Sequence, residues 1–208
     1  MAYDLPIVTD LELLDRLFGL VKTTIDKHVH INLEWLISKK FVAVPIDRDL
    51  NSFFSWSDNE ISYDESLFNF FLNLSICART LGCEFCYAIP TDRAPVYKVK
   101  LSTEQLDNFW HKCNAFNYVL MPIDQSFLLL WSAMEYIILS GPKDFVEGVL
   151  GCNLEVAKER FRHFAKYYRD NPYVTVVGLT TPEKKEHFYS KLERNLLLVL
   201  ERYEICNV

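Results

Sequence analysis

The sequence predicts an α+β fold: a single domain with a largely antiparallel sheet and helices packed on one side or at one end. Pairs of short strand-like runs alternate with helical runs along the chain. Three apolar runs near the centre are joined by connections too short for a parallel crossover, which needs about a dozen residues. Half of the 208 residues are apolar. This is enough for a sizeable core, so we expect one globular domain over residues 1–208.

Helices are expected where a capping signal precedes apolar residues at helical spacing. Capping boxes at Thr9, Ser62 and Ser102 predict helices over residues 10–26, 62–81 and 102–114, and in the second helix we expect Phe68 on the buried face. Three further helices are expected after Gly141-Pro142, after Asn153 and from Thr181-Pro182 to about residue 206.

Strands are expected where apolar residues alternate with polar ones or form short runs between turns. Alternation over residues 29–35 predicts a first strand with His28 and His30 on one side. The other expected strands cover residues 41–46, 83–89, 95–101, 116–121, 127–131, 136–139 and, more briefly, 173–177. The three central runs, from residue 116 to 139, should form an antiparallel meander.

Charge and hydropathy exclude two classes of partner. The formal net charge of −6 has the wrong sign for a general binder of phosphate backbones, so we expect no free nucleic acid partner. Unbroken apolar runs do not exceed five residues, far below the roughly 20 that span a bilayer, so we expect no membrane partner. The first ten residues lack the basic and apolar regions of a secretory signal, which predicts a cytoplasmic protein.

The six cysteines and the histidines offer two candidate metal or redox sites. Cys83 and Cys86 have CxxC spacing, but they follow a helix end and enter a strand, where residues three apart point to opposite faces. Buried structural thiols are the favoured interpretation. A solvent-facing sheet surface likewise explains His28 and His30 better than metal binding does. We therefore expect no metal, no cofactor and no catalytic residue.

Sequence motifs of catalysis are absent from the chain. It contains no GxSxG, HExxH, GxxxxGK[ST] or GxGxxG pattern. A catalytic site dispersed over the sequence stays open, and it would use His28, His30 or the region of Cys83 and Cys86.

One segment combines acidic and aromatic residues. Between residues 41 and 65 there are six acids and one base, which gives −5 and leaves −1 for the other 183 residues. Large aromatics ringed by charge are typical of protein-binding hot spots, and an acidic field speeds encounter with a basic partner. The expected partner-binding residues are Asp47, Asp49, Phe53, Phe54, Trp56, Asp58, Glu60, Asp64 and Glu65. The alternative is a loop folded onto its aromatics.

A basic stripe forms a counterpart to this acidic segment in the sequence. Arg162, Lys166 and Arg169 share one face of an expected helix. An ordinary solvated helix face explains them.

The stretch from residue 83 to 168 resembles small cytosolic immunity proteins that accompany bacterial contact-dependent and other polymorphic toxins. The resemblance is carried by a strand, a D-x-S-F-like turn, another strand and a G-x-x-x-F-V-like helix start. In this sequence these four features are residues 117–122, 124–127, 136–142 and 144–147, and residues 161–165 add a fifth similar stretch. It implies a non-catalytic inhibitor that binds one toxin domain, often a basic nuclease. It transfers no binding residue, because each immunity surface is specific to its toxin.

The acidic and aromatic segment, in a chain without catalytic motifs, and the family resemblance both favour the same function. This is a non-catalytic cytosolic immunity protein that neutralises a cognate, basic nuclease-type toxin domain. Two alternatives remain. The first is an enzyme with a dispersed and metal-assisted site. The second is a structural or adaptor protein whose acidic segment docks a cellular partner.

Overall fold

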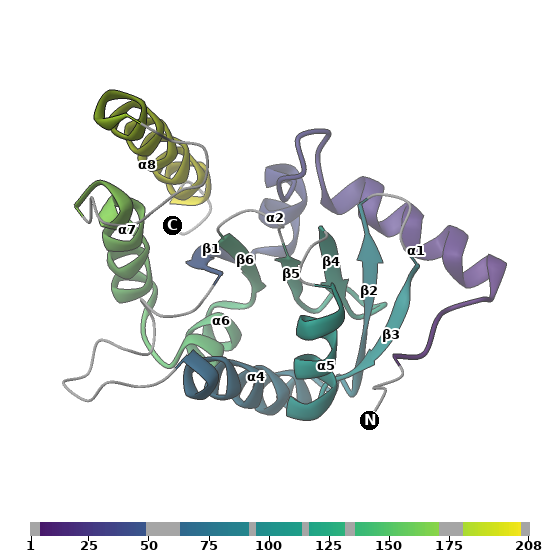
Figure 1. Cartoon of the computed structure of the whole chain (residues 1–208). Coiled ribbons are helices and arrows are strands. Elements are labelled where there is room, and N and C mark those ends of the chain that lie inside the picture. Colours follow the sequence, from purple (N-terminus) through teal and green to yellow (C-terminus); the bar gives the residue numbers. More distant parts are fainter. Residues whose placement is uncertain are drawn as a thin grey trace.

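A computed structural model gives the fold (Figure 1). It describes residues 5–48, 63–91, 95–113, 117–131, 136–170 and 181–204. The helices are α1 (Leu11–Thr24), α2 (Leu33–Lys39), α4 (Tyr63–Thr80), α5 (Thr103–Cys113), α6 (Lys143–Leu150), α7 (Leu154–Asp170) and α8 (Pro182–Glu204). The strands are β1 (Val42–Asp47), β2 (Phe85–Pro90), β3 (Tyr97–Lys100), β4 (Tyr118–Met121), β5 (Leu128–Trp131) and β6 (Tyr136–Gly141).

The strands form one six-stranded sheet in the order β1-β6-β5-β4-β2-β3. Every pair of neighbours is antiparallel, and Leu129 of β5 lies between Leu120 of β4 and Leu139 of β6. The antiparallel α+β prediction and the central meander are therefore confirmed. Short connections allow only this pairing.

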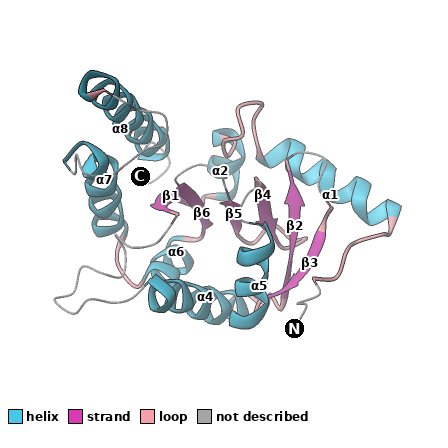
Figure 2. Ribbon diagram, viewed as in Figure 1, coloured by secondary structure: helices cyan, strands magenta, loops and turns pink. Residues whose placement is uncertain are grey.

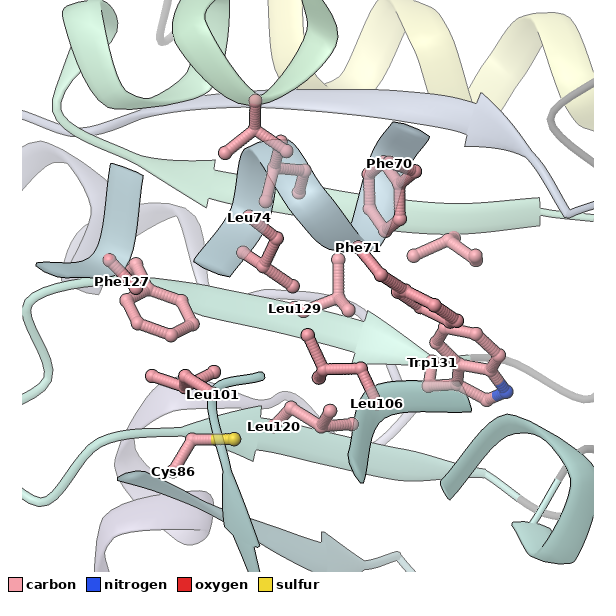
Figure 3. Close-up of a cluster of buried hydrophobic side chains, with 14 of the residues drawn as sticks. Phe70, Phe71, Leu74, Cys86, Leu101, Leu106, Leu120, Phe127, Leu129 and Trp131 are labelled. Carbon is pink, nitrogen blue, oxygen red and sulfur yellow. The ribbon is translucent and has the colours of Figure 1, made fainter. Parts of the chain in front are cut away.

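Helices cover both faces of the sheet (Figure 2). On one face α4, α5 and α6 pack on alternate strand residues such as Leu129 and Trp131 (Figure 3). On the other, α1, α2 and the end of α8 pack on Leu128 and Leu130. The expectation of helices on one side or at one end is thus too narrow, because the central strands are apolar on both faces and each face needs a cover.

The two edges of the sheet are protected in different ways. Pro45 lies within β1, where a missing N–H is tolerated at an edge, and α7 and α8 pack together beside this strand (Figure 1). At the other edge, the chain before α1 runs along β3. The amide of Val8 donates to the carbonyl of Val96, and the amide of Lys98 donates to that of Pro6, both at 2.9 Å. Both edges are therefore blunted.

The expected strand over residues 29–35 is wrong. Asn32 caps α2 instead, because its side-chain oxygen accepts a hydrogen bond from the amide of Glu34 at 2.9 Å. Val29 has a φ of 60°, which no strand residue adopts. The alternation of apolar and polar residues here arises from a turn followed by a helix that buries Trp35 and Leu36.

Capping signals predict the ends of the helices more accurately than the spacing of apolar residues predicts their buried faces. Gly82, with a φ of 76°, closes α4, and Asn153 caps α7 through the amide of Val156. Phe68, however, is exposed, and Phe70 is fully buried in its place. The expected strand over residues 173–177 lies outside the described residues.

No described helix is both long and apolar enough to cross a bilayer.

Replacing Leu129 by Ala should lower the free energy of unfolding by about 2–5 kcal/mol, because this fully buried side chain would leave a cavity at the centre of the sheet. Urea unfolding measures the change. Leu11→Ala is the control, since Leu11 is 78% exposed and its loss should change stability by about 0.5 kcal/mol or less. Equal effects of the two changes would contradict this position of β5.

Candidate functional site: an acidic groove and a histidine turn

The expected partner-binding residues fall mainly in a part of the chain that the structure does not describe. This applies to Asp49, Phe53, Phe54, Trp56, Asp58 and Glu60. Asp64 and Glu65 occupy positions in the first turn of α4. Asp47 ends β1 and is 1% exposed, so the expectation that it offers a surface charge is wrong. Its carboxylate lies within the protein because β1 continues one residue further than the sequence predicts.

A groove between α4 and α5 lies next to these positions. It has a volume of 480 Å³ and is lined by Leu67, Phe68, Phe71, Thr103, Glu104, Asp107 and His111. We call it the α4–α5 groove. Figure 1 shows the two helices side by side on one face of the sheet.

The α4–α5 groove combines an exposed aromatic ring with carboxylates. Phe68 is 52% exposed on α4, one turn beyond the positions of Asp64 and Glu65. Glu104 is exposed on the first turn of α5, and Asp107 follows one turn later. Nε2 of His111 lies 3.5 Å from a carboxylate oxygen of Asp107. The groove thus has the aromatic and acidic character that the sequence predicts for the preceding segment.

The CxxC thiols lie in or beside the core. Cys86 faces the interior among Leu101 and Leu120 (Figure 3), and burial raises the pKa of its thiol far above the ordinary value. Burial also raises the pKa of Cys83, whose Sγ lies 3.0 Å from the hydroxyl of Ser126. The burial of both thiols fits the interpretation of Cys83 and Cys86 as structural residues.

A tight turn after α1 holds both histidines. A single oxygen, Oδ1 of Asp26, accepts hydrogen bonds from the backbone amides of His28 at 2.8 Å and His30 at 3.1 Å. His28 is exposed, whereas His30 is half-buried against α8. Within the described residues, no group of three or more His, Cys, Asp or Glu side chains could hold a metal ion.

The turn is anchored to the last helix. Nη2 of Arg202 in α8 lies 2.7 Å from Oδ2 of Asp26, and the hydroxyl of Tyr203 accepts a hydrogen bond from the amide of Ile31 at 3.0 Å. Burial opposes ionisation of Asp26, but the amides of His30 and His28 and the Arg202 charge together hold its pKa below the ordinary value. Burial, and then the charge of Arg202, lowers the pKa of His30.

The basic stripe on α7 is partly neutralised. Arg162 pairs with Glu159 at 3.1 Å and with Glu204 of α8 at 2.6 Å. Lys166 is exposed, and Arg169 is in the last turn of α7. Arg162 of the stripe therefore links α7 to α8 through an ion pair, while Lys166 lies on a solvent-exposed helix face.

Sequence reasoning missed the α4–α5 groove and the pairing of Asp26 with Arg202. Phe68 and Glu104 come from different helices, and Asp26 and Arg202 are 176 residues apart. The only available signal was the capping box at Ser102, which places Glu104 at the exposed start of a helix.

Comparison of the chain with models of protein families, with curated proteins and with solved structures finds no match. What the chain does is therefore inferred from the geometry of its own residues.

Removing the Asp26 charge should make stability less dependent on pH. Because the pKa of Asp26 is lowered on folding, its ionised form stabilises the fold above the ordinary Asp pKa, and this contribution is lost as pH falls through the folded pKa. Asp26→Asn should cost about 1 kcal/mol at pH 7 and much less at pH 3. Urea unfolding at both pH values measures this. Asp15→Asn, on the exposed face of α1, is the control, and an equal loss at both pH values in Asp26→Asn would contradict the ionised pair.

Both CxxC thiols should resist alkylation in the folded protein and react after unfolding, since the burial that raises their pKa also blocks access. Mass spectrometry after iodoacetamide treatment locates the modified residues, with the half-buried Cys77 and Cys152 as internal references.

Elemental analysis of the purified protein should find no zinc. About one zinc per chain, lost in Cys83→Ser, would establish a metal site instead.

Proposed function

We propose that this chain is a non-catalytic, cytosolic immunity protein that binds and neutralises a cognate toxin domain, and that the α4–α5 groove forms part of its binding surface. The observation that carries the proposal is the groove itself. A large apolar ring, Phe68, stands 52% exposed beside two carboxylates, Glu104 and Asp107. An isolated helix pair gains nothing from leaving such a ring in water.

The chemistry of the groove favours a basic partner. A guanidinium or ammonium group can stack over the face of Phe68 and reach the carboxylates on α5 at the same time. His111 is the one basic group that lines the described groove, and it lies against Asp107. The negative charge of Glu104 is therefore available for an incoming cation.

In the sequence, an acidic segment leads into α4, the helix that forms one wall of the groove. Without the buried Asp47, residues 48–65 carry five acids and one base, and the last three of these residues form the first turn of α4. The roles of Trp56 as an anchor and of Asp58 and Glu60 as steering charges remain predictions, because these residues lie outside the described ranges.

A nuclease toxin is the partner that this surface fits best. Such an enzyme binds its substrate through positive groups that contact phosphates. Carboxylates at matching positions would occupy those groups and block the nucleic-acid site, so that inhibition would need no catalysis. The free thiols of the described cysteines are compatible with the reducing cytosol in which such an inhibitor works.

The experiment begins with the partner. Co-expression of the chain with the products of its genomic neighbours, followed by copurification, is expected to yield a basic protein whose toxicity the chain suppresses. The proposal would be contradicted if no basic neighbour copurified with the chain. It would also be contradicted if the chain suppressed the toxicity of a neighbour without forming a complex with it.

Reversing the charge of the groove should slow association. In Glu104→Lys/Asp107→Lys we expect the association rate with the copurified partner to fall about tenfold or more at low salt, and its salt dependence to weaken. Stopped-flow kinetics at two salt concentrations measure both effects. The matched control is Glu12→Lys/Asp15→Lys, which makes the same charge change at the same spacing on α1, distant from the groove in the fold (Figure 1).

Removing the exposed ring should act on dissociation. Phe68→Ala is expected to speed dissociation and to cost about 1–2 kcal/mol of binding free energy, with little change in association rate. Circular dichroism first confirms that the variant folds, as the exposure of Phe68 predicts. Unchanged kinetics in both groove variants would assign the interface elsewhere, most simply to the α7 stripe.

A further inference from the structure

A second groove runs along α8, on the opposite side of the sheet from the α4–α5 groove. It has a volume of 430 Å³, within the range of about 300–1,000 Å³ typical of small-molecule sites. It is lined by His30, Tyr136, Leu192, Asn195, Leu196, Leu198, Val199 and Arg202. We call it the α8 groove.

One end of the α8 groove is polar and offers hydrogen-bond donors. Arg202 and His30 lie there, and Arg202 can only donate. The nearby carboxylate of Asp26 already has hydrogen-bond partners. Its Oδ1 accepts hydrogen bonds from two backbone amides, and its Oδ2 accepts one from Nη2 of Arg202. Nε of Arg202 and Nδ1 of His30 are buried and have no hydrogen-bond partner within the described residues, so neither atom reaches a ligand in the groove. The side chain of Arg202 is 31% exposed, and its guanidinium is therefore the donor that an anionic acceptor at this end can reach.

Apart from Asn195, the rest of the α8 groove is mainly apolar. Leu192, Leu196 and Val199 lie along α8, and the half-buried Tyr136 from the start of β6 also lines the groove. From position 192 to position 202 a helix rises about 15 Å, the length of a short extended hydrocarbon chain. Leu198, 52% exposed, lies at the open side.

From this arrangement we infer that the α8 groove binds a small amphipathic carboxylate, with the carboxylate at Arg202 and His30 and a single hydrocarbon tail along Leu192, Leu196 and Val199. A guanidinium pairs with a carboxylate through charge-assisted hydrogen bonds, and the apolar wall takes the tail out of water. The inference does not depend on the proposed protein partner, since the two grooves share no residue.

The test uses octanoate and the full chain. Octanoate should shift the NMR signals of the His30 ring saturably, below the concentration at which it forms micelles. Octanol has the tail without the charge, and octylamine has the opposite charge. Both should bind about tenfold more weakly or not at all. No shift of His30 with octanoate, or equal binding of all three compounds, would overturn the inference.

Two variants locate the site. Arg202→Gln should weaken octanoate binding about tenfold or more, whereas Arg194→Gln, the same charge change on an exposed position of α8 outside the groove, should leave it unchanged. Leu198→Asp should weaken binding as well, by placing a like charge beside the ligand, and its exposed position allows folding if Arg202→Gln does not fold. Equal affinity in Leu198→Asp and Arg194→Gln would overturn the assignment.

Discussion

The fold depends on one constraint: the central strands of the sheet are buried on both faces. Each residue of β5, from Leu128 to Trp131, is at most 1% exposed, so two layers of helices must cover the sheet. On one face this requirement sets α4 beside α5 and creates the α4–α5 groove. On the other it brings the end of α8 against the turn after α1, where Asp26 meets Arg202. Both candidate binding surfaces are therefore consequences of covering the sheet.

Much of the fold could be predicted because its signals are local. Capping residues such as Asn153 and the glycine at Gly82 act within one helix turn, and the meander follows from the length of its connections. The misread strand over residues 29–35 shows the limit of periodicity. The side-chain cap at Asn32 and the burial of Trp35 make that segment a turn followed by a helix. An alternation of apolar and polar residues does not reveal either feature. Likewise, the spacing in α4 could not distinguish Phe68 from Phe70 as the buried ring.

The candidate sites were less predictable, since they are built from residues far apart in the sequence. The acidic bias of residues 47–65 is visible in composition, but that Phe68 would share a groove with Glu104 and Asp107 depends on how two helices pack. The donors of the α8 groove meet only when the last helix closes on the turn after the first. By contrast, the sequence correctly predicts that Cys83 and Cys86 are buried, because both belong to short apolar runs.

The central functional claim is that a basic protein partner contacts the α4–α5 groove. Site-specific photocrosslinking in cells that also make the genomic neighbour tests it most directly, with a benzophenone side chain replacing Phe68 of α4 or Tyr167 of α7. These two aromatic residues are matched in exposure, at 52% and 50%, and lie on different helices. The claim predicts a crosslink to the neighbour from position 68 and none from position 167. A crosslink from position 167 alone would contradict it.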